Sequence, residues 1–271
     1  MRRFLSQVLC VFCYTLAHAS PTTFQIANDI VIPGGLDRWL TNEFKLSKQY
    51  DDYTYAFSNE MYTPTSKKSE EIPYGDRNWD GYSYFEVTKR KPIVFGENKT
   101  YSFRVGAVGE ASGAQALQQF IHDDLGMGQH PTWATQNPSE PALEYIYSHN
   151  TNQYVDSLVG ITNVAQSYGF RVGNVVDEVF VKHQLTKNYF SKLFIYTGLE
   201  GKSVLYNTHL DGRLFQSNVY TVDSTWFVAS TTAGVGIDIY GVRVSYEYKY
   251  TTEEFDGQNG RHTYGSLTFT F

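Results

Sequence analysis

The stretch GVRVSYEYKY, residues 241–250, alternates between two kinds of side chain. Apolar and aromatic side chains occupy every second position, at Val242, Val244, Tyr246, Tyr248 and Tyr250. Small polar or charged side chains occupy most of the positions between them. A period of two places each set on its own face of a β-strand. Aromatic residues on the apolar face are typical of a strand between lipid and a polar lumen, whereas the apolar face of a water-soluble sandwich usually holds more Val, Ile and Leu.

Two further stretches extend this pattern. TYSFRVGAVG, residues 100–109, alternates in the same way. GSLTFTF, residues 265–271, places Leu267, Phe269 and Phe271 on one face, and the sequence ends on Phe271. A last strand that ends in Phe resembles the signal by which the barrel assembly machinery takes up bacterial outer-membrane barrels. The alternative is an ordinary edge strand.

The first 19 residues have the features of a secretory signal peptide. Arg2 and Arg3 precede an apolar run, and the AHA of residues 17–19 suits cleavage before Ser20. The alternative is a buried N-terminal helix. Both cysteines lie in this segment, so a mature chain of residues 20–271 would have no disulfide. Its net charge of about −8 argues against nucleic acid as a partner.

The remaining sequence predicts one all-β domain. Aromatic residues make up 16% of the chain, and after the N-terminus no apolar run is long enough for a transmembrane helix. Candidate strands lie near residues 23–32, 40–48, 52–61, 80–89, 100–108, 141–150, 155–165, 167–176, 189–200, 203–210, 218–231, 235–250 and 262–271. Bacterial single-chain barrels have an even number of strands. We therefore expect two short candidates to be one strand, which gives a 12-stranded antiparallel transmembrane β-barrel, with loops at 62–79 and 251–261.

The stretch SGAQALQQFIHDDLGMG, residues 112–128, breaks the β pattern. Its apolar residues Ala114, Leu117, Ile121 and Leu125 have nearly helical spacing. We expect a short extracellular loop helix over 113–125, with Ser112 capping its start and Gly126 ending it. Such a helix would lie outside the hydrocarbon region, against the wall or mouth of the barrel. Gln118 and His122 are four residues apart and share one helical face.

Small polar side chains gather near the first strand. Asn28 and Asp29, read as successive strand residues, would point to opposite faces at a rim of the barrel, where a β-bulge can re-aim a side chain. Their oxygens and that of Thr41 are hard ligands that suit Ca²⁺. The alternative is a polar strand end with an Asx-type turn.

His122 is the natural candidate for a general base, because the unperturbed pKa of histidine lies near neutrality. The alternative is a structural histidine in a loop helix. The other histidines are scattered without metal-ligand spacing, and the sequence contains no Gly-x-Ser-x-Gly motif.

These motifs together resemble one family, the bacterial outer-membrane lipid A 3′-O-deacylases of the LpxR type. The family pattern begins with an Asn-Asp pair, an Asp-Arg pair and an aromatic-Thr-Asn-Gly strand start. Here the counterparts are Asn28-Asp29, Asp37-Arg38 and WLTNEF at residues 39–44. Further matches cover EMYTP at 60–64, YGDR at 74–77, residues 108–143 and residues 197–215. The matches run in order through nearly all of the mature chain.

The resemblance implies Ca²⁺-dependent hydrolysis of the ester that attaches the 3′-linked acyloxyacyl group of lipid A. It implies His122 as the base, with Asn28, Asp29 and Thr41 completing the site and Asp29 as the principal metal ligand. Lys67 or Lys68 matches a basic position that would pair with a lipid A phosphate. The expected setting is the bacterial outer membrane, with a monomer whose site faces the outer leaflet and acts on lipopolysaccharide among outer-membrane lipids.

The sequence departs from the family pattern at three positions. Leu40 replaces an aromatic residue, Glu43 stands where Gly is common, and Gly128 stands where the family can have an acid. Asp123 and Glu140 are candidates to replace that acid. Two other functions stay open: an outer-membrane phospholipase A-type esterase, and a non-enzymatic barrel that acts as a channel or adhesin. The helix with His122 and the Asn28-Asp29 pair argue against the non-enzymatic barrel, since a channel has no need of either.

Overall fold

The structure is a computed structural model that describes residues 20–32, 38–66, 71–92, 98–124, 131–150, 153–160, 163–172, 192–217, 219–239 and 242–271. Its strands are β1 Thr22–Asn28, β2 Trp39–Tyr50, β3 Tyr53–Thr63, β4 Asp80–Pro92, β5 Asn98–Val108, β6 Glu140–Asn150, β7 Gln153–Gly160, β8 Asn163–Val172, β9 Lys192–Asn207, β10 Phe227–Ile239, β11 Val242–Thr251 and β12 His262–Thr270. The connections contain the 3₁₀ helices η1 Asp29–Val31 and η3 Gly109–Ser112 and the α-helix α2 Ala114–Asp123. The predicted all-β antiparallel class is confirmed.

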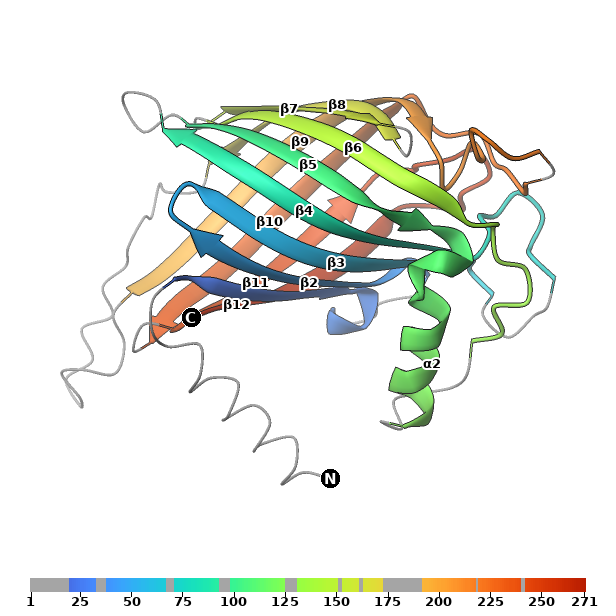
Figure 1. Cartoon of the computed structure of the whole chain (residues 1–271), viewed down its shortest axis with the longest axis horizontal. Coiled ribbons are helices and arrows are strands. Elements are labelled where there is room, and N and C mark those ends of the chain that lie inside the picture. The colour runs from blue at the N-terminus through green and yellow to red at the C-terminus, as the bar shows by residue number, and fades with distance from the viewer. Residues whose placement is uncertain are drawn as a thin grey trace.

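The strands form one closed barrel (Figure 1). Each strand pairs antiparallel with its neighbours in sequence, and β1 also pairs with β12, where Phe24 lies opposite Phe269. Just beyond β12, the Phe271 N–H donates to the Thr22 carbonyl at 2.9 Å, and the Thr22 N–H donates to the Phe271 carbonyl at 3.2 Å. Closure gives both the first and the last strand a partner on each side, which removes the edges of an open sheet.

The alternation read from the sequence separates an apolar outer face from a polar lumen. Phe57, Phe85, Val105 and Leu143 lie opposite one another across β3 to β6 and are exposed on the outer face. The residues that alternate with them face the lumen. Among the described residues no helix is long and apolar enough to cross a membrane.

Charged groups in the lumen are tied together between strands. Arg104 Nε lies 2.5 Å from Glu86 Oε2, and Arg104 Nη1 lies 3.3 Å from Glu144 Oε2. Lys45 Nζ lies 3.2 Å from the other oxygen of Glu86, and the Tyr82 hydroxyl donates to Glu144 at 2.9 Å. These contacts join β2, β4, β5 and β6 across the interior, so that the buried charges of this cluster are paired.

The two ends of the barrel differ in their connections. Thr22 and Phe271 lie at one end, here called the terminus end, together with the turn at 51–52 between β2 and β3. The opposite end, here called the loop end, carries connections 29–38, 64–79, 109–139, 161–162, 208–226 and 252–261. Both segments predicted to be loops, 62–79 and 251–261, belong to the loop end.

Several strand boundaries differ from the predictions. The candidates at 189–200 and 203–210 are one long strand, β9, which is the expected merger. The prediction of a single strand over 235–250 is wrong, because β10 and β11 form a hairpin whose connection is 240–241. The first strand ends at Asn28 instead of continuing to residue 32, because η1 turns the chain there.

The predicted loop helix is α2, but its start differs from the prediction. Ser112 belongs to η3, and the N-cap of α2 is Gly113, which has a left-handed φ of 69° and no side chain to cap with. The Ser112 hydroxyl instead donates to the Gly109 carbonyl at 2.6 Å and accepts the Ala114 N–H at 3.2 Å. The predicted end at Gly126 lies outside the described residues.

Candidate functional site

The predicted site residues from the first two strands lie on the outer face at the loop end. Asn28 is opposite Asn42, Asn42 is opposite Met61, and Met61 is opposite Gly81. This row runs across β1, β2, β3 and β4. The Asn28 amide nitrogen donates to the Asn42 side-chain oxygen at 3.2 Å. Since period-2 alternation continues along these strands, the whole row faces away from the lumen.

A β-bulge in β2 sets the position of Thr41. Leu40 is opposite Tyr62 and Asn42 is opposite Met61, so Thr41 is an extra residue without its own partner in the register. Its buried hydroxyl lies 2.5 Å from the hydroxyl of Thr63. The sequence pattern allows a bulge at the rim with Asn28 and Asp29, whereas the bulge lies in β2.

Asp29 is the first residue of η1, so the prediction that Asn28 and Asp29 are successive strand residues is wrong. The Asp29 side chain is buried, and its Oδ2 accepts the Arg38 N–H from the far side of the 29–38 connection. η1 packs on the outer face against β12, where a Cβ at Gly265 would lie 2.9 Å from the Ile32 side chain. The turn thus holds the carboxylate beside Asn28 on the same outer face.

Helix α2 packs on the outer wall over β3 and β4. A Cβ at Gly81 would lie 2.1 Å from Ser112 Oγ and 2.4 Å from Ala114 Cβ, so the helix start sits directly on the glycine. The Asn59 amide and the Ser83 hydroxyl both donate to the Ser112 carbonyl, at 3.3 Å and 2.6 Å. These contacts anchor the start of the helix to the strands beneath it.

An apolar cluster fills the space between α2 and the wall. Met61, Trp79, Ala114 and Trp133 are buried together, and Phe44 and Leu117 pack against them. The two tryptophan rings lie 5.1 Å apart between centroids. Because Phe44 belongs to β2, the cluster extends from the helix toward the first strands.

A polar side chain of α2 is hydrogen-bonded to the apolar cluster. The Trp133 indole N–H donates to Gln118 Oε1 at 2.6 Å, and Gln118 is buried. His122, one turn further along, is half-buried, and its Nδ1 is shielded from solvent without a hydrogen-bond partner among the described residues. The predicted shared face of Gln118 and His122 accords with this placement.

His122 and the first-strand candidates lie on the outer side of the barrel, on separate elements. Asn28 contacts Asn42, Asp29 contacts the Arg38 N–H, and Thr41 contacts Thr63. Asn28 and Asp29 form further interactions as well. Lys67, Lys68 and Gly128 lie outside the described residues.

Glu140 has a structural role in the interior. Its two carboxylate oxygens accept the Leu214 and Phe215 N–H groups, each at 3.1 Å. It therefore anchors the 208–226 connection instead of lying beside His122. Asp123 is the exposed last residue of α2.

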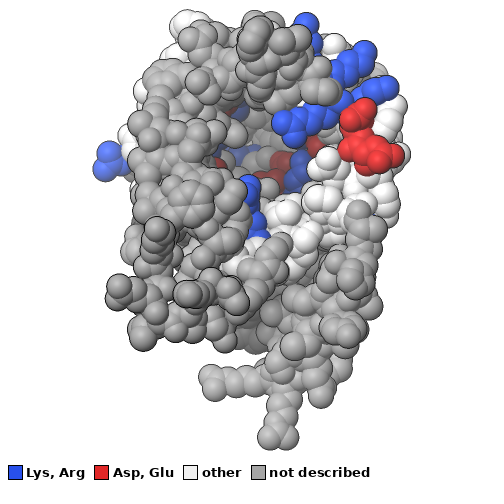
Figure 2. Space-filling view, turned by 90° about the vertical axis from the view of Figure 1, so that its left-hand side faces the viewer, with Lys and Arg blue, Asp and Glu red and all other residues white. Residues whose placement is uncertain are grey.

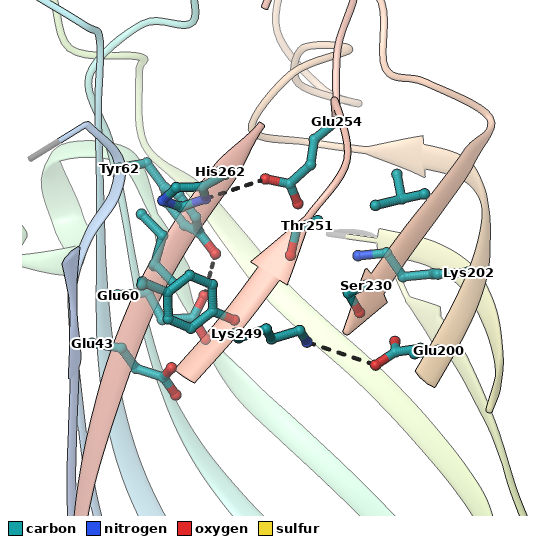
Figure 3. A pocket seen from close by; sticks show the side chains of 13 residues that line it. Glu43, Glu60, Tyr62, Glu200, Lys202, Ser230, Lys249, Thr251, Glu254 and His262 are labelled. Atoms are coloured by element: carbon teal, nitrogen blue, oxygen red, sulfur yellow. Dashed lines mark hydrogen bonds and ion pairs between the residues drawn. The ribbon is translucent and has the colours of Figure 1, made fainter. Parts of the chain in front are cut away.

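A separate polar cavity of about 220 Å³ lies in the lumen at the loop end (Figure 3). Its lining includes Leu40, Glu43, Glu60, Glu200, Lys202, Lys249, Glu254 and His262. Lys249 Nζ lies 3.6 Å from Glu200 Oε2, and His262 Nδ1 lies 3.8 Å from Glu254 Oε2. Leu40 and Glu43 both line this cavity, so two departures from the family pattern lie inside the barrel, away from the outer face with His122.

Charge around the cavity shifts the ionisation of Glu254, which lies in the 252–261 connection. Burial raises its pKa, but the hydrogen bond to His262 and the charge of Lys202 outweigh burial and lower the pKa to about 2. The carboxylate is therefore ionised at neutral pH, as its pairing with His262 requires.

A buried network that the sequence did not reveal holds the loop end together. Asp80 Oδ2 lies 2.9 Å from His209 Nδ1, and Arg213 Nη2 donates to Asp80 Oδ1 at 2.8 Å. Asp76 accepts the Trp39 indole N–H at 3.2 Å. Asp76 belongs to the stretch 74–77, and His209 and Arg213 belong to the stretch 197–215, so the resemblance of these stretches to the family was the available signal for three of the residues.

The oxygen donors near Asn28 suit a hard cation. Among the described residues no group of three or more His, Cys, Asp or Glu side chains could hold a metal. Of the described residues on this face, Asp29 would supply a carboxylate to a Ca²⁺ site, and Ca²⁺ also accepts neutral oxygens and water as ligands. Since the Asn28 amide nitrogen donates to Asn42, its oxygen is the atom that would act as a ligand.

Comparisons with known proteins bear on the family and on the fold of the chain. Residues 4–182 and 160–271 match the family described as outer membrane protein LpxR. The fold is similar to LpxR from Salmonella typhimurium, with a TM-score of 0.73, 20% sequence identity and coverage of 93% of this chain and 99% of that chain. A monoaromatic hydrocarbon channel, the TodX deltaS2 mutant, covers 93% of this chain and 87% of its own at 10% identity and a TM-score of 0.32. A search of curated protein sequences finds no match.

Proposed function

Because the chain belongs to the outer membrane protein LpxR family, we propose that it is a Ca²⁺-dependent lipid A 3′-O-deacylase of the bacterial outer membrane. The reaction is hydrolysis of the ester that attaches the 3′-linked acyloxyacyl group. The observation that carries the proposal is the position of α2, which holds a half-buried histidine on the outer wall, on the same face as Asn28 and Asp29. A lipid substrate reaches an outer face without entering the lumen.

The length of α2 supports contact between His122 and the site residues near the first two strands. Gly81, under the helix start, lies three strands from Asn28 in the row, a lateral distance of roughly 14 Å at ordinary strand spacing. From Ala114 to His122 the helix rises about 12 Å. In Figure 1 α2 runs from the end of β4 past the ends of β3 and β2, on the same side as η1. The proposal requires that His122, further along the helix, lie toward β1.

The proposed mechanism assigns one role to each side chain. His122 takes a proton from a water molecule, whose oxygen attacks the ester carbonyl carbon. The Thr41 hydroxyl and the Asn28 amide are the polar groups beside the carbonyl oxygen of the ester, and they orient it. The proton held by His122 then passes to the departing sugar oxygen, which yields a sugar hydroxyl and an acyloxyacyl carboxylic acid. When bound to Asp29 and neighbouring oxygens, Ca²⁺ supplies positive charge that stabilises the developing oxyanion.

The barrel architecture supports a defined orientation in the membrane. Outer-membrane barrels have short periplasmic turns and longer extracellular loops. The terminus end, with turns such as Asp51–Asp52, would face the periplasm, and the loop end would face outward. The site would then act on the outer leaflet, with Lys67 or Lys68 proposed to pair with a lipid A phosphate. A monomer suffices, because all proposed residues belong to one chain.

The test is hydrolysis by the purified, folded barrel. Purified lipid A is incubated with the protein and Ca²⁺, and the products are weighed by mass spectrometry. We expect loss of the mass of one acyloxyacyl group. The His122→Ala variant should lose activity by roughly 10²–10⁴-fold, the usual effect of removing a general base.

The matched control is Gln115→Ala, which changes another partly exposed polar residue of the same helix and should retain activity. Heat-modifiable migration in detergent gels checks that every variant remains a closed barrel. Wild-type turnover by a folded His122→Ala barrel would overturn the proposed base. Hydrolysis of glycerophospholipid with lipid A left intact would instead indicate a phospholipase.

A further inference from the structure

The outer face at the terminus end carries a cluster of lysines and tyrosines that the deacylase site does not use. We call this cluster the basic girdle, and it consists of Lys48, Lys89, Lys91 and Lys99 with Tyr50, Tyr53, Tyr101 and Tyr147. Figure 2 looks onto this end of the barrel and shows Lys and Arg side chains gathered along one edge, beside acidic side chains. The basic girdle lies on β2 to β6, far from α2 along the strands.

Strand register places the basic girdle on the outer face below the apolar band. The exposed row of Phe57, Phe85, Val105 and Leu143 is followed two residues later by Tyr55, Val87, Phe103 and Tyr145, which are also exposed. Two residues further comes the row of Tyr53, Lys89, Tyr101 and Tyr147. Lys91 and Lys99 form the next pair. The change from apolar rows to Tyr and then Lys is the sequence of groups expected on passing from hydrocarbon to lipid headgroups.

The tyrosines hold the lysine heads against the wall. Lys48 Nζ lies 5.2 Å from the ring centroid of Tyr50, and Lys89 Nζ lies 5.0 Å from that of Tyr53. Lys91 Nζ lies 5.5 Å from the ring centroid of Tyr101. Contact with a ring face restricts a lysine that would otherwise sample many rotamers. Three of the four ammonium groups are thereby held near the tyrosine row.

The basic girdle contains a pair of like charges that lie opposite one another. Lys91 and Lys99 are directly opposite on neighbouring strands, where side chains approach closely and like charges are destabilising. Lys89 is two residues from Lys91 on the same face. Among the described residues none of the four lysines forms an ion pair. The turn between β2 and β3 contains Asp51 and Asp52, whose two carboxylates do not balance four ammonium groups.

We propose that the basic girdle binds the headgroup of an anionic glycerophospholipid, of which phosphatidylglycerol is the representative, in the periplasmic leaflet. The phosphate would lie between Lys89, Lys91 and Lys99 and relieve the repulsion of the opposed pair. The acyl chains would lie along the apolar rows above. A zwitterionic lipid fits less well, because its own ammonium group would meet the same lysines. The proposal depends on the proposed membrane orientation but not on the proposed reaction.

The test measures lipids retained by the folded, full-length barrel in detergent. Equal amounts of phosphatidylglycerol and phosphatidylethanolamine are added, and native mass spectrometry counts the bound lipids. Wild type should retain phosphatidylglycerol in preference. The Lys91→Gln/Lys99→Gln variant should lose the preference by roughly fivefold for each lysine removed, the factor for about 1 kcal/mol per basic residue at an anionic membrane surface.

The matched control is Lys202→Gln/Lys249→Gln, which removes the same charge from the lumen cavity and should retain the preference. Equal retention of both lipids by wild type would overturn the proposal, as would an unchanged preference in Lys91→Gln/Lys99→Gln. Displacement of the lipid by an equal concentration of inorganic phosphate would also overturn it, because the cluster would then recognise the free ion. Lipid retention does not depend on catalysis, so an inactive barrel that keeps the preference separates this proposal from the deacylase.

Discussion

At Asn28, Asp29 and Thr41, small changes of backbone direction decide which polar atoms share a space. The bulge at Thr41 lets both Thr41 and Asn42 leave the strict alternation of β2. The 3₁₀ turn at Asp29 ends the strand directly after Asn28. The Arg38 N–H then fixes one carboxylate oxygen. Ordinary strand geometry would have sent these groups to opposite faces.

The first residue-scale prediction concerns Asp29. Chelation should remove the lipid A hydrolase activity of wild type, and added Ca²⁺ should restore it. Asp29→Ala should stay inactive at Ca²⁺ concentrations that saturate wild type, by roughly a hundredfold or more, because an amide and a hydroxyl supply no anionic ligand. Product mass spectrometry across a Ca²⁺ titration measures this.

The control for Asp29 is Glu110→Ala, which removes an exposed carboxylate from η3 at the same end of the barrel. This variant should show the Ca²⁺ response of wild type. If Asp29→Ala also responded like wild type, the metal would have to be held elsewhere, and the Asn28-Asp29 pair would be only a strand end.

The element that matters most for the site is α2, which rests on a glycine. Gly81 leaves room for Ser112 and Ala114 to touch the wall, and the apolar cluster below Leu117 fills the remaining space. The helix has 10 residues, too few to be stable by itself in water. Its position, and with it that of His122, therefore depends on packing against the barrel.

Replacement of Gly81 should reduce activity while the barrel remains folded. In Gly81→Val the new side chain would occupy the space of Ser112 Oγ and Ala114 Cβ, so the helix must move outward. A displacement of about 1 Å of a catalytic group can cost roughly a hundredfold in rate. We expect that loss in the deacylase assay, together with altered fluorescence of Trp79 and Trp133, while the barrel keeps its heat-modifiable migration.

Ala233→Val is the matched control, because Ala233 is exposed on β10, opposite Tyr248 and away from the helix. The control should keep activity and fluorescence. Full activity in a folded Gly81→Val barrel would mean that the packing of α2 against Gly81 does not position the site.

On the scale of the whole molecule, ion pairs between side chains in the polar lumen connect several strands. Arg104 joins Glu86 and Glu144, and Lys45 adds a further strand to this cluster. At the loop end, Asp80, His209 and Arg213 tie the 208–226 connection to β4. Ion pairs in the lumen therefore stabilise the barrel, whereas the candidate catalytic residues lie on its outer face.

Loss of Arg104 should weaken the entire barrel. Arg104→Ala leaves the buried carboxylates of Glu86 and Glu144 without their shared cation, a change that costs about 3–5 kcal/mol in comparable buried pairs. We expect a lower temperature for loss of the folded band in heat-modifiability gels. Arg104→Met combined with Glu144→Gln should recover part of that temperature, because the second change removes one uncompensated charge. No recovery would indicate that Arg104 acts through packing alone.

Alternation along the strands and the helical spacing of α2 made much of this architecture predictable. The errors arose where alternation carries no information. Gly201 and Lys202 read as a turn inside β9, and the β10–β11 hairpin has a connection too short to interrupt the pattern. The 3₁₀ turn at Asp29 does not follow from a period of two.

The lumen contacts were beyond prediction for another reason. Asp80 and His209 are separated by 129 positions in sequence, and only the closed order of strands brings them together. In contrast, the shared face of Gln118 and His122 follows from a spacing of four within one helix. Local periodicity thus predicts which face a residue occupies, but not which distant residue meets it there.

The seam between β1 and β12 has a consequence for the timing of activity. The strand that carries Asn28 is completed on one side by the last strand of the chain, and the turn with Asp29 rests on Gly265 of that same strand. A chain in which β1 has not yet paired with β12 therefore has an incomplete site, even if α2 is already in place. Under the proposed function, completion of the site and closure of the barrel are a single event, and an incompletely inserted intermediate would not hydrolyse lipid of the membrane that is receiving it.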